Sequence, residues 1–192
     1  MYLKLSHLTQ VISGYSFRGS IDDLPNGTHR VILVRDLNIL NPIDDYTDLL
    51  LVNFENTNTD AIVKPSDILL STRGTDTAGL KVGIYNGTKD NVIATSSLFI
   101  LRVNKIKILP EYLLFYLNSR RGQNALKNIM SGATVKTISK KEIADIQILV
   151  PPIKEQTLLV GTLSNMEKQT KLLQTKIQLL NLLIENILSK TQ

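Results

Sequence analysis

The stretch from Pro151 to Gln192 constrains the fold of this chain more than any other. Apolar residues recur along it in alternating steps of four and three, a spacing typical of a coiled-coil seam. The members of this seam are Leu159, Leu163, Met166, Thr170, Leu173, Ile177, Leu180, Ile184 and Ile187, with Thr170 as the one polar member. A helix of about 30 residues rises about 1.5 Å per residue and is roughly 45 Å long. Because the preceding domain does not need that length for its own closure, we expect the helix to join or space other parts.

A proline pair, Pro151-Pro152, separates this helix from the rest of the chain. Proline disfavours helix before it and tolerates helix directly after it, so we expect the helix to begin near Ile153. The 192 residues then divide into two parts. Residues 1–150 have the size of one domain, and residues 151–192 form the helix.

Within residues 1–150 the sequence predicts strands first and helices later. The first hundred residues contain short β-branched runs separated by polar turns, which favour strands. The apolar spacing then becomes helical and predicts helices at 110–119 and 122–130. Ser139 and Glu142 have the spacing of a capping box, and a last strand is expected at 146–151. The fold class is therefore α+β: a mixed, largely β domain followed by a long C-terminal coiled-coil helix.

Charge is unevenly distributed along the chain. The formal net charge is +5, yet residues 1–99 carry eight Lys or Arg against eleven Asp or Glu. Residues 100–141 carry nine Lys or Arg against Glu111 alone. Such a basic block indicates a polyanionic partner, which would bind through its phosphates. The alternative interpretation is a basic face that water solvates.

Several kinds of chemistry lack support in the sequence. There is no Cys, so neither a disulfide nor a thiolate metal site can form. The two histidines, His7 and His29, have no second metal ligand at a suitable spacing, and no phosphate-binding or nucleophile motif occurs. We therefore predict a binding module with no catalytic site, metal or cofactor of its own. No signal peptide and no run of 18 apolar residues is present, so we expect a cytoplasmic protein that is not in a membrane.

Two polar segments are candidates for binding. The segment Ser-Thr-Arg-Gly-Thr-Asp-Thr-Ala-Gly at 71–79 offers hydroxyls, a guanidinium and a carboxylate, which suit the reading of base edges. The segment Gly-Tyr-Ser-Phe-Arg-Gly-Ser at 14–20 is expected to be a turn that exposes two aromatic rings and an arginine. For both segments the alternative is an ordinary solvated turn.

Four segments in this order resemble the specificity subunit of type I restriction–modification systems. They are the segment at 14–20, SDILLSTRGTDTAGLKVGIY at 66–85, PEYLLFYLNSRRGQNALKNIMSGATVKTISKKEIADIQILVPPIKEQ at 110–156, and the long helix. The resemblance covers nearly the whole chain. It implies a target-recognition domain (1–150) followed by a conserved spacer helix (151–192) that packs in an antiparallel coiled coil. A full subunit has two domains and two helices, so this chain looks like a half-length form.

The resemblance also implies partners. Two copies would pair through their helices and read an interrupted palindrome in double-stranded DNA. Methyltransferase (modification) subunits would dock on this homodimer and carry S-adenosylmethionine, and a restriction (translocase) subunit is a further candidate partner. Two alternatives stay open: pairing with a different half-subunit, and a coiled-coil scaffold that does not bind DNA.

Candidate DNA-binding residues follow from the same resemblance. The loop that carries residues 73–81 would lie at the bases, and the turn at 14–20 would form a second contact. The phosphates would be positioned by Lys136, Thr137, Lys140 and Lys141. Arg35 ends an expected strand in a charged pair with Asp36. The candidates are Tyr15, Phe17, Arg18, Arg35, Arg73, Thr75, Asp76, Thr77, Lys81, Lys136, Thr137, Lys140 and Lys141.

Overall fold

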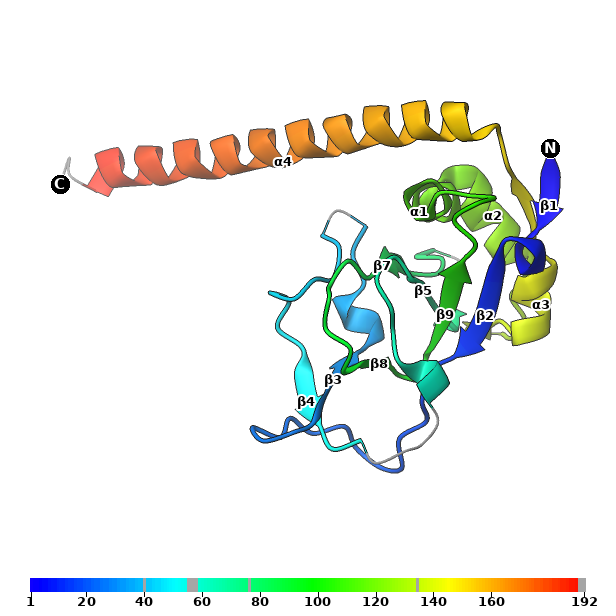
Figure 1. Ribbon diagram of the computed structural model, residues 1–192. Coiled ribbons are helices and arrows are strands. Elements are labelled where there is room, and N and C mark those ends of the chain that lie inside the picture. The colour runs from blue at the N-terminus through cyan, green and yellow to red at the C-terminus, as the bar shows by residue number, and fades with distance from the viewer. Residues whose placement is uncertain (40, 55–58, 76, 134, 190–192) are drawn as a thin grey trace.

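The computed structural model describes residues 1–39, 41–54, 59–75, 77–133 and 135–189. It shows a mixed α+β domain with one long helix passing over it, which confirms the expected fold class (Figure 1). The strands are β1 (Tyr2–Lys4), β2 (Thr9–Ser13), β3 (His29–Ile32), β4 (Leu50–Val52), β5 (Ile68–Ser71), β6 (Arg73–Gly74), β7 (Val82–Ile84), β8 (Val92–Ala94), β9 (Leu98–Val103), β10 (Lys136–Thr137) and β11 (Gln147–Leu149). The α-helices are α1 (Pro110–Asn118), α2 (Arg120–Ile129), α3 (Lys140–Asp145) and α4 (Ile153–Ser189).

An antiparallel sheet with the strand order β2-β9-β5-β7 lies at the centre of the domain. All four residues of β5 are buried, because both faces of this sheet are covered. Ile68 and Leu70 point into a core that α1, α2 and α3 complete, whereas Leu69 points to the opposite side. The period-two alternation of a strand thus divides one apolar run between two cores.

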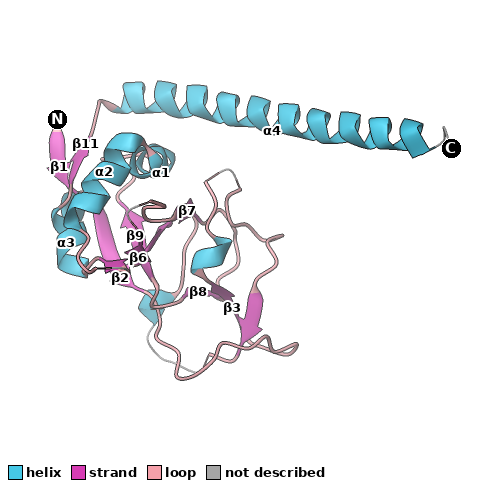
Figure 2. Ribbon diagram, turned by 180° about the vertical axis from the view of Figure 1, so that it is seen from behind, coloured by secondary structure: helices cyan, strands magenta, loops and turns pink. Residues whose placement is uncertain are grey.

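A second sheet, with the order β4-β3-β8, covers that opposite side. Strand β3 pairs antiparallel with β4 and parallel with β8. Ile32, Val92 and Ala94 from this sheet pack with Leu69 and Ile100 of the central sheet. The helices therefore cover one face of the central sheet and the second sheet covers the other, as the view from behind shows (Figure 2).

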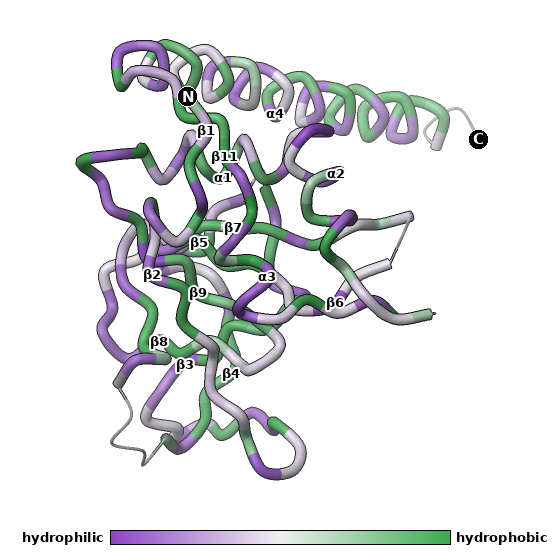
Figure 3. Tube along the Cα trace, turned by 90° about the vertical axis from the view of Figure 1, so that its right-hand side faces the viewer, coloured by the Kyte–Doolittle hydropathy of each residue, from purple (hydrophilic) through white to green (hydrophobic). Residues whose placement is uncertain are grey.

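The chain reaches α4 from the short pair β1–β11, in which Tyr2 lies opposite Leu149. Helix α4 begins at Ile153, directly after the proline pair, as the sequence predicted. Its 37 residues correspond to a length of roughly 55 Å, longer than expected. The helix runs over the domain, where Lys171 donates a hydrogen bond of 3.2 Å to the Asn41 side chain, and its C-terminal part extends past the domain (Figure 1). Apolar residues follow it to its far end (Figure 3). No helix in the described ranges combines the length and the apolar character that crossing a membrane requires.

Candidate nucleic-acid interface

The strands β6 and β10 form a small antiparallel ribbon on the surface of the domain. Arg73 lies opposite Thr137, and Gly74 lies opposite Lys136. The ribbon is continued by a hydrogen bond of 3.0 Å from the Ile138 amide to the Thr72 carbonyl. This pairing brings together two predicted binding segments that are more than 60 residues apart in the sequence.

A tight loop follows β6 and is closed by its own backbone. The Thr75 carbonyl accepts a hydrogen bond from the Gly79 amide at 2.8 Å, and the Thr75 hydroxyl accepts one from the Ala78 amide at 3.0 Å. Gly79 has φ +67°, a conformation that side chains with a Cβ rarely adopt. Thr77 is exposed at the tip of the loop. The predicted contact residue Asp76 lies outside the described residues.

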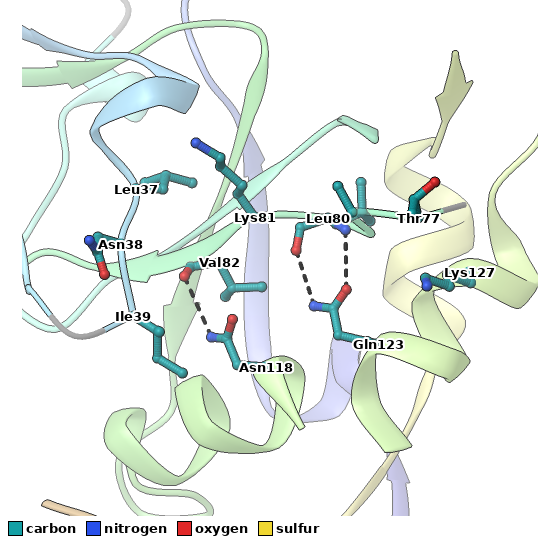
Figure 4. Close-up of a pocket in the computed structure, with 11 residues that line it drawn as sticks. Leu37, Asn38, Ile39, Thr77, Leu80, Lys81, Val82, Asn118, Gln123 and Lys127 are labelled. Carbon is teal, nitrogen blue, oxygen red and sulfur yellow. Dashed lines mark hydrogen bonds between the residues drawn. The ribbon is translucent and has the colours of Figure 1, made fainter. Parts of the chain in front are cut away.

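Two side-chain amides hold the end of this loop in place (Figure 4). Gln123 accepts a hydrogen bond from the Leu80 amide at 3.1 Å and donates one to the Leu80 carbonyl at 3.0 Å. Asn118 donates to the Val82 carbonyl at 3.5 Å. Because β7 is the edge strand of the central sheet, these amides satisfy backbone groups that have no strand partner there. The loop is thereby tied to the rigid pair α1 and α2.

The predicted phosphate-binding lysines lie next to the ribbon in the chain. Lys140 and Lys141 are exposed and open α3, three and four residues after Thr137. The capping box predicted for this helix is present: Ser139 accepts from the Glu142 amide, and Glu142 accepts from the Ser139 amide at 2.7 Å. This backbone hydrogen bond stabilises the carboxylate and lowers the pKa of Glu142. The start of α3 is therefore fixed where the two lysines are presented.

The ribbon and its surroundings expose most of the predicted contact residues. Arg73, Thr75, Thr77, Lys81 and Thr137 are exposed, and Lys136 is half-buried. The structure thus brings these predicted contact residues together on one surface, which is built from β6, β10 and the loop between β6 and β7.

The remaining candidates lie in the part of the domain built on β3, β4 and β8. Tyr15 and Phe17 were expected to be exposed, and this expectation was wrong, because both rings are half-buried. The Tyr15 ring packs edge-on against Phe17 and Phe54, with centroids 4.9 Å apart in each pair. Arg18 is exposed in the same segment. Arg35 is also exposed, and its guanidinium lies 3.7 Å from the Asp36 carboxylate. A contact with DNA stays a prediction for all four.

Sequence reasoning missed three residues at this surface: Gln123, Asn118 and Lys127. Gln123 and Asn118 bind backbone, and nothing in a single sequence marks an amide for that role. Lys127 belongs to the basic block between residues 100 and 141, so the charge count included it without singling it out. Its side chain lies close to the loop: the Lys127 Cε is 3.5 Å from the position that a Cβ atom would take at Gly79.

The predicted seam of α4 is uncovered within this chain. Eight of its nine residues are exposed, Ile177 at 57%, and Leu163 is partly buried. The Thr170 hydroxyl donates a hydrogen bond of 2.9 Å to the Met166 carbonyl, so its polar group is satisfied inside its own helix. An exposed apolar stripe of this length indicates a surface that another protein surface covers.

Comparison with known proteins shows which family this sequence matches. The sequence model of the type I restriction modification DNA specificity domain matches residues 2–182. The putative type I restriction enzyme MjaX specificity subunit of Methanocaldococcus jannaschii is 31% identical over 116 residues, which are 60% of this chain and 27% of that protein. The MjaVIII specificity subunit of the same organism is 28% identical over 125 residues, 65% of this chain and 28% of that protein.

Solved structures share the fold. The HsdS subunit from Thermoanaerobacter tengcongensis superposes with a TM-score of 0.63 at 20% identity, over 92% of this chain and 39% of that one. The S subunit of the type I restriction-modification system from M. genitalium gives 0.60 at 14% identity, over 93% and 42%. This chain thus spans about a quarter of the curated relatives and about two fifths of the solved subunits. Because the family model covers nearly its whole length, the chain belongs to the family of type I restriction modification DNA specificity domains.

Proposed function

We propose that this chain reads a short DNA sequence on behalf of a type I restriction–modification complex. The observation that carries the proposal is the β6–β10 ribbon, which presents Arg73, Thr75 and Thr137 together on a rigid support. The major groove of DNA is about 12 Å wide and admits a two-stranded β-ribbon. In this proposal residues 1–150 are the recognition domain and residues 151–192 are the spacer.

The residue types on the ribbon suit direct reading of bases. An arginine can donate two hydrogen bonds to guanine, and a threonine can contact a base edge or the methyl group of thymine. The flanking lysines Lys136, Lys140 and Lys141 would bind phosphates and set the position of the ribbon without reading sequence. Arg73 and Thr137 are the residues that we expect to determine base choice.

Helix α4 would pair with α4 of a second copy through the exposed seam. Burying a Leu or Ile side chain stabilises an assembly by roughly 1.5–3 kcal/mol, so eight apolar positions per chain are enough to offset the cost of association. A two-fold dimer would hold two recognition domains apart and read an interrupted palindrome. The helix length of roughly 55 Å corresponds to about one and a half turns of DNA, at about 34–36 Å per turn, so half-sites between one and two turns apart are expected.

The chemistry of the complex would reside on other subunits. Methyltransferase subunits, with S-adenosylmethionine bound, would dock on the dimer, and a restriction subunit would join them. The chain itself would determine which DNA sequence is bound and how far apart the two half-sites lie. Its seam and its ribbon support these two roles.

The test is selection of binding sequences from random DNA duplexes, together with light scattering of the purified protein. We expect a dimer at micromolar concentration and an enriched motif made of two inverted half-sites. Ile177→Glu should give a monomer that enriches one half-site only, because an unpaired charge in the seam opposes pairing. Gln178→Glu adds the same charge beside the seam and should leave the dimer intact.

Each outcome has a distinct meaning. A monomer at micromolar concentration would refute pairing through α4. A dimer that enriches no motif and shows no salt-dependent affinity for DNA would instead support a coiled-coil scaffold. A heterodimer with an asymmetric motif would show that the natural partner is a different half-subunit.

A further inference from the structure

A pocket of about 430 Å³ opens beside the β6–β10 ribbon (Figure 4). Its walls come from residues 37–39, from the segment between β6 and β7, and from the pair α1 and α2. The polar side chains that line it are Asn38, Thr77, Lys81, Asn118, Gln123 and Lys127. The pocket is therefore built in part by the loop that carries Thr75 and Thr77, and it extends from this loop to α1 and α2.

The described lining of this pocket carries charge of one sign. Lys81 and Lys127 both line it, and no Asp or Glu is among the lining residues that the structure describes, which leave out Asp76. Neither lysine forms an ion pair within the described part of the chain. The Lys81 side chain points away from Lys127, so the two ammonium groups add positive charge to different walls of the pocket (Figure 4). The lining thus favours an anionic ligand.

The backbone segments that carry the two lysines are joined to each other by hydrogen bonds. Lys81 follows Leu80, whose backbone is held by both ends of the Gln123 amide. Lys127 lies one helical turn after Gln123 on α2, and its stem passes close to Gly79. The absence of a side chain at Gly79 leaves room for the Gln123 amide, whose oxygen would clash with a Cβ atom there. The backbone positions from which the two lysines project are thereby set by the fold on both sides of the loop.

We infer that this pocket binds a backbone phosphate of the same DNA whose bases the ribbon reads. When a two-stranded ribbon lies in the major groove, the sugar–phosphate chains run along both of its sides. The pocket lies on one such side, next to the loop. Lys127, beside Gly79, acts as a point charge on the phosphate and fixes the depth of the loop. This inference rests on the proposed function and adds Lys127 to the contact residues.

The first measurement is the salt dependence of DNA affinity for Lys127→Gln, Lys127→Arg and the wild type. Each phosphate contact contributes about 0.9 to the slope of log affinity against log salt concentration. We expect Lys127→Gln to reduce that slope by about one contact and to weaken target and non-target duplexes by the same factor, and Lys127→Arg to restore both. Lys168→Gln, which removes one exposed charge from α4, is the matched control and should change neither.

The second measurement uses duplexes in which single phosphates are replaced by neutral methylphosphonates. In the wild type, one position flanking the half-site should weaken binding, and in Lys127→Gln the same replacement should have no further effect. A slope for Lys127→Gln equal to that of the control, with wild-type binding intact, would overturn the pocket assignment alone. A wild type that binds no DNA would overturn the proposed function and this inference with it.

Discussion

One buried amide attaches the first turn of α4 to the domain, and its removal gives a quantitative test. Gln156 has no exposed surface. Its oxygen accepts a hydrogen bond from the Leu109 amide at 2.8 Å, and its nitrogen donates one to the Pro151 carbonyl at 2.9 Å. Leu109 caps the start of α1, so this side chain joins the first turn of α4 to α1. We predict that Gln156→Ala loosens the helix from the domain.

The size of the effect follows from the two hydrogen bonds. Each contributes about 0.5–1.5 kcal/mol net, so losing both costs about 1–3 kcal/mol, and more if the freed groups stay buried. In a protein of 150–250 residues, about 1 kcal/mol lowers the melting temperature by about 2–4 °C. Gln156→Ala should therefore lower the melting temperature by roughly 2–12 °C.

Scanning calorimetry measures this change, and two further variants sharpen it. Gln156→Glu keeps the acceptor for the Leu109 amide but loses the donor to Pro151, so we expect a loss no smaller than one hydrogen bond. Gln178→Ala removes an exposed glutamine from α4 and should leave the melting temperature unchanged. A melting temperature for Gln156→Ala within about 1 °C of the wild type would show that this amide does not hold α4.

Three other perturbations follow from the geometry. Arg102→Ala leaves the Asp67 carboxylate, 2% exposed, without its guanidinium, and urea unfolding should show a loss of about 3–5 kcal/mol. Gly79→Ala would strain a residue with positive φ by about 1–3 kcal/mol, and selected DNA motifs should become less defined. Glu142→Gln removes a carboxylate whose pKa is lowered on folding. The variant should therefore melt at a lower temperature than the wild type above about pH 4.3, and this difference should shrink as the pH falls through the lower pKa of the folded state.

The features that could be predicted are those that depend on neighbours in the chain. The proline pair fixed the start of α4, because the rule for proline concerns only adjacent residues. Ser139 and Glu142 are three residues apart, and their reciprocal hydrogen bonds form within that span. The helices expected at 110–119 and 122–130 are present with small shifts, as α1 and α2.

The features that could not be predicted depend on contacts between distant segments. The pairing of Arg73 with Thr137 joins strands of two residues each, which are too short for any periodic pattern. Tyr15 and Phe17 lie in a segment with flanking glycines that predicts exposure, yet both pack against a distant cluster formed by Val31, Val52, Phe54 and Ile93. The candidate interface was therefore recognisable as separate segments, and only the fold shows which of them meet.

Helix α4 also exposes apolar residues that do not belong to the seam. Leu172, Leu179 and Leu183 are exposed, and at 3.6 residues per turn they lie about 100° around the helix from Leu173. A two-stranded coiled coil covers only the seam, so a dimer would leave this second stripe in water. Within the proposed complex, the methyltransferase and restriction subunits are the protein surfaces that would cover it. We therefore expect that the second stripe, and not the seam, limits how stable the dimer is without its partners.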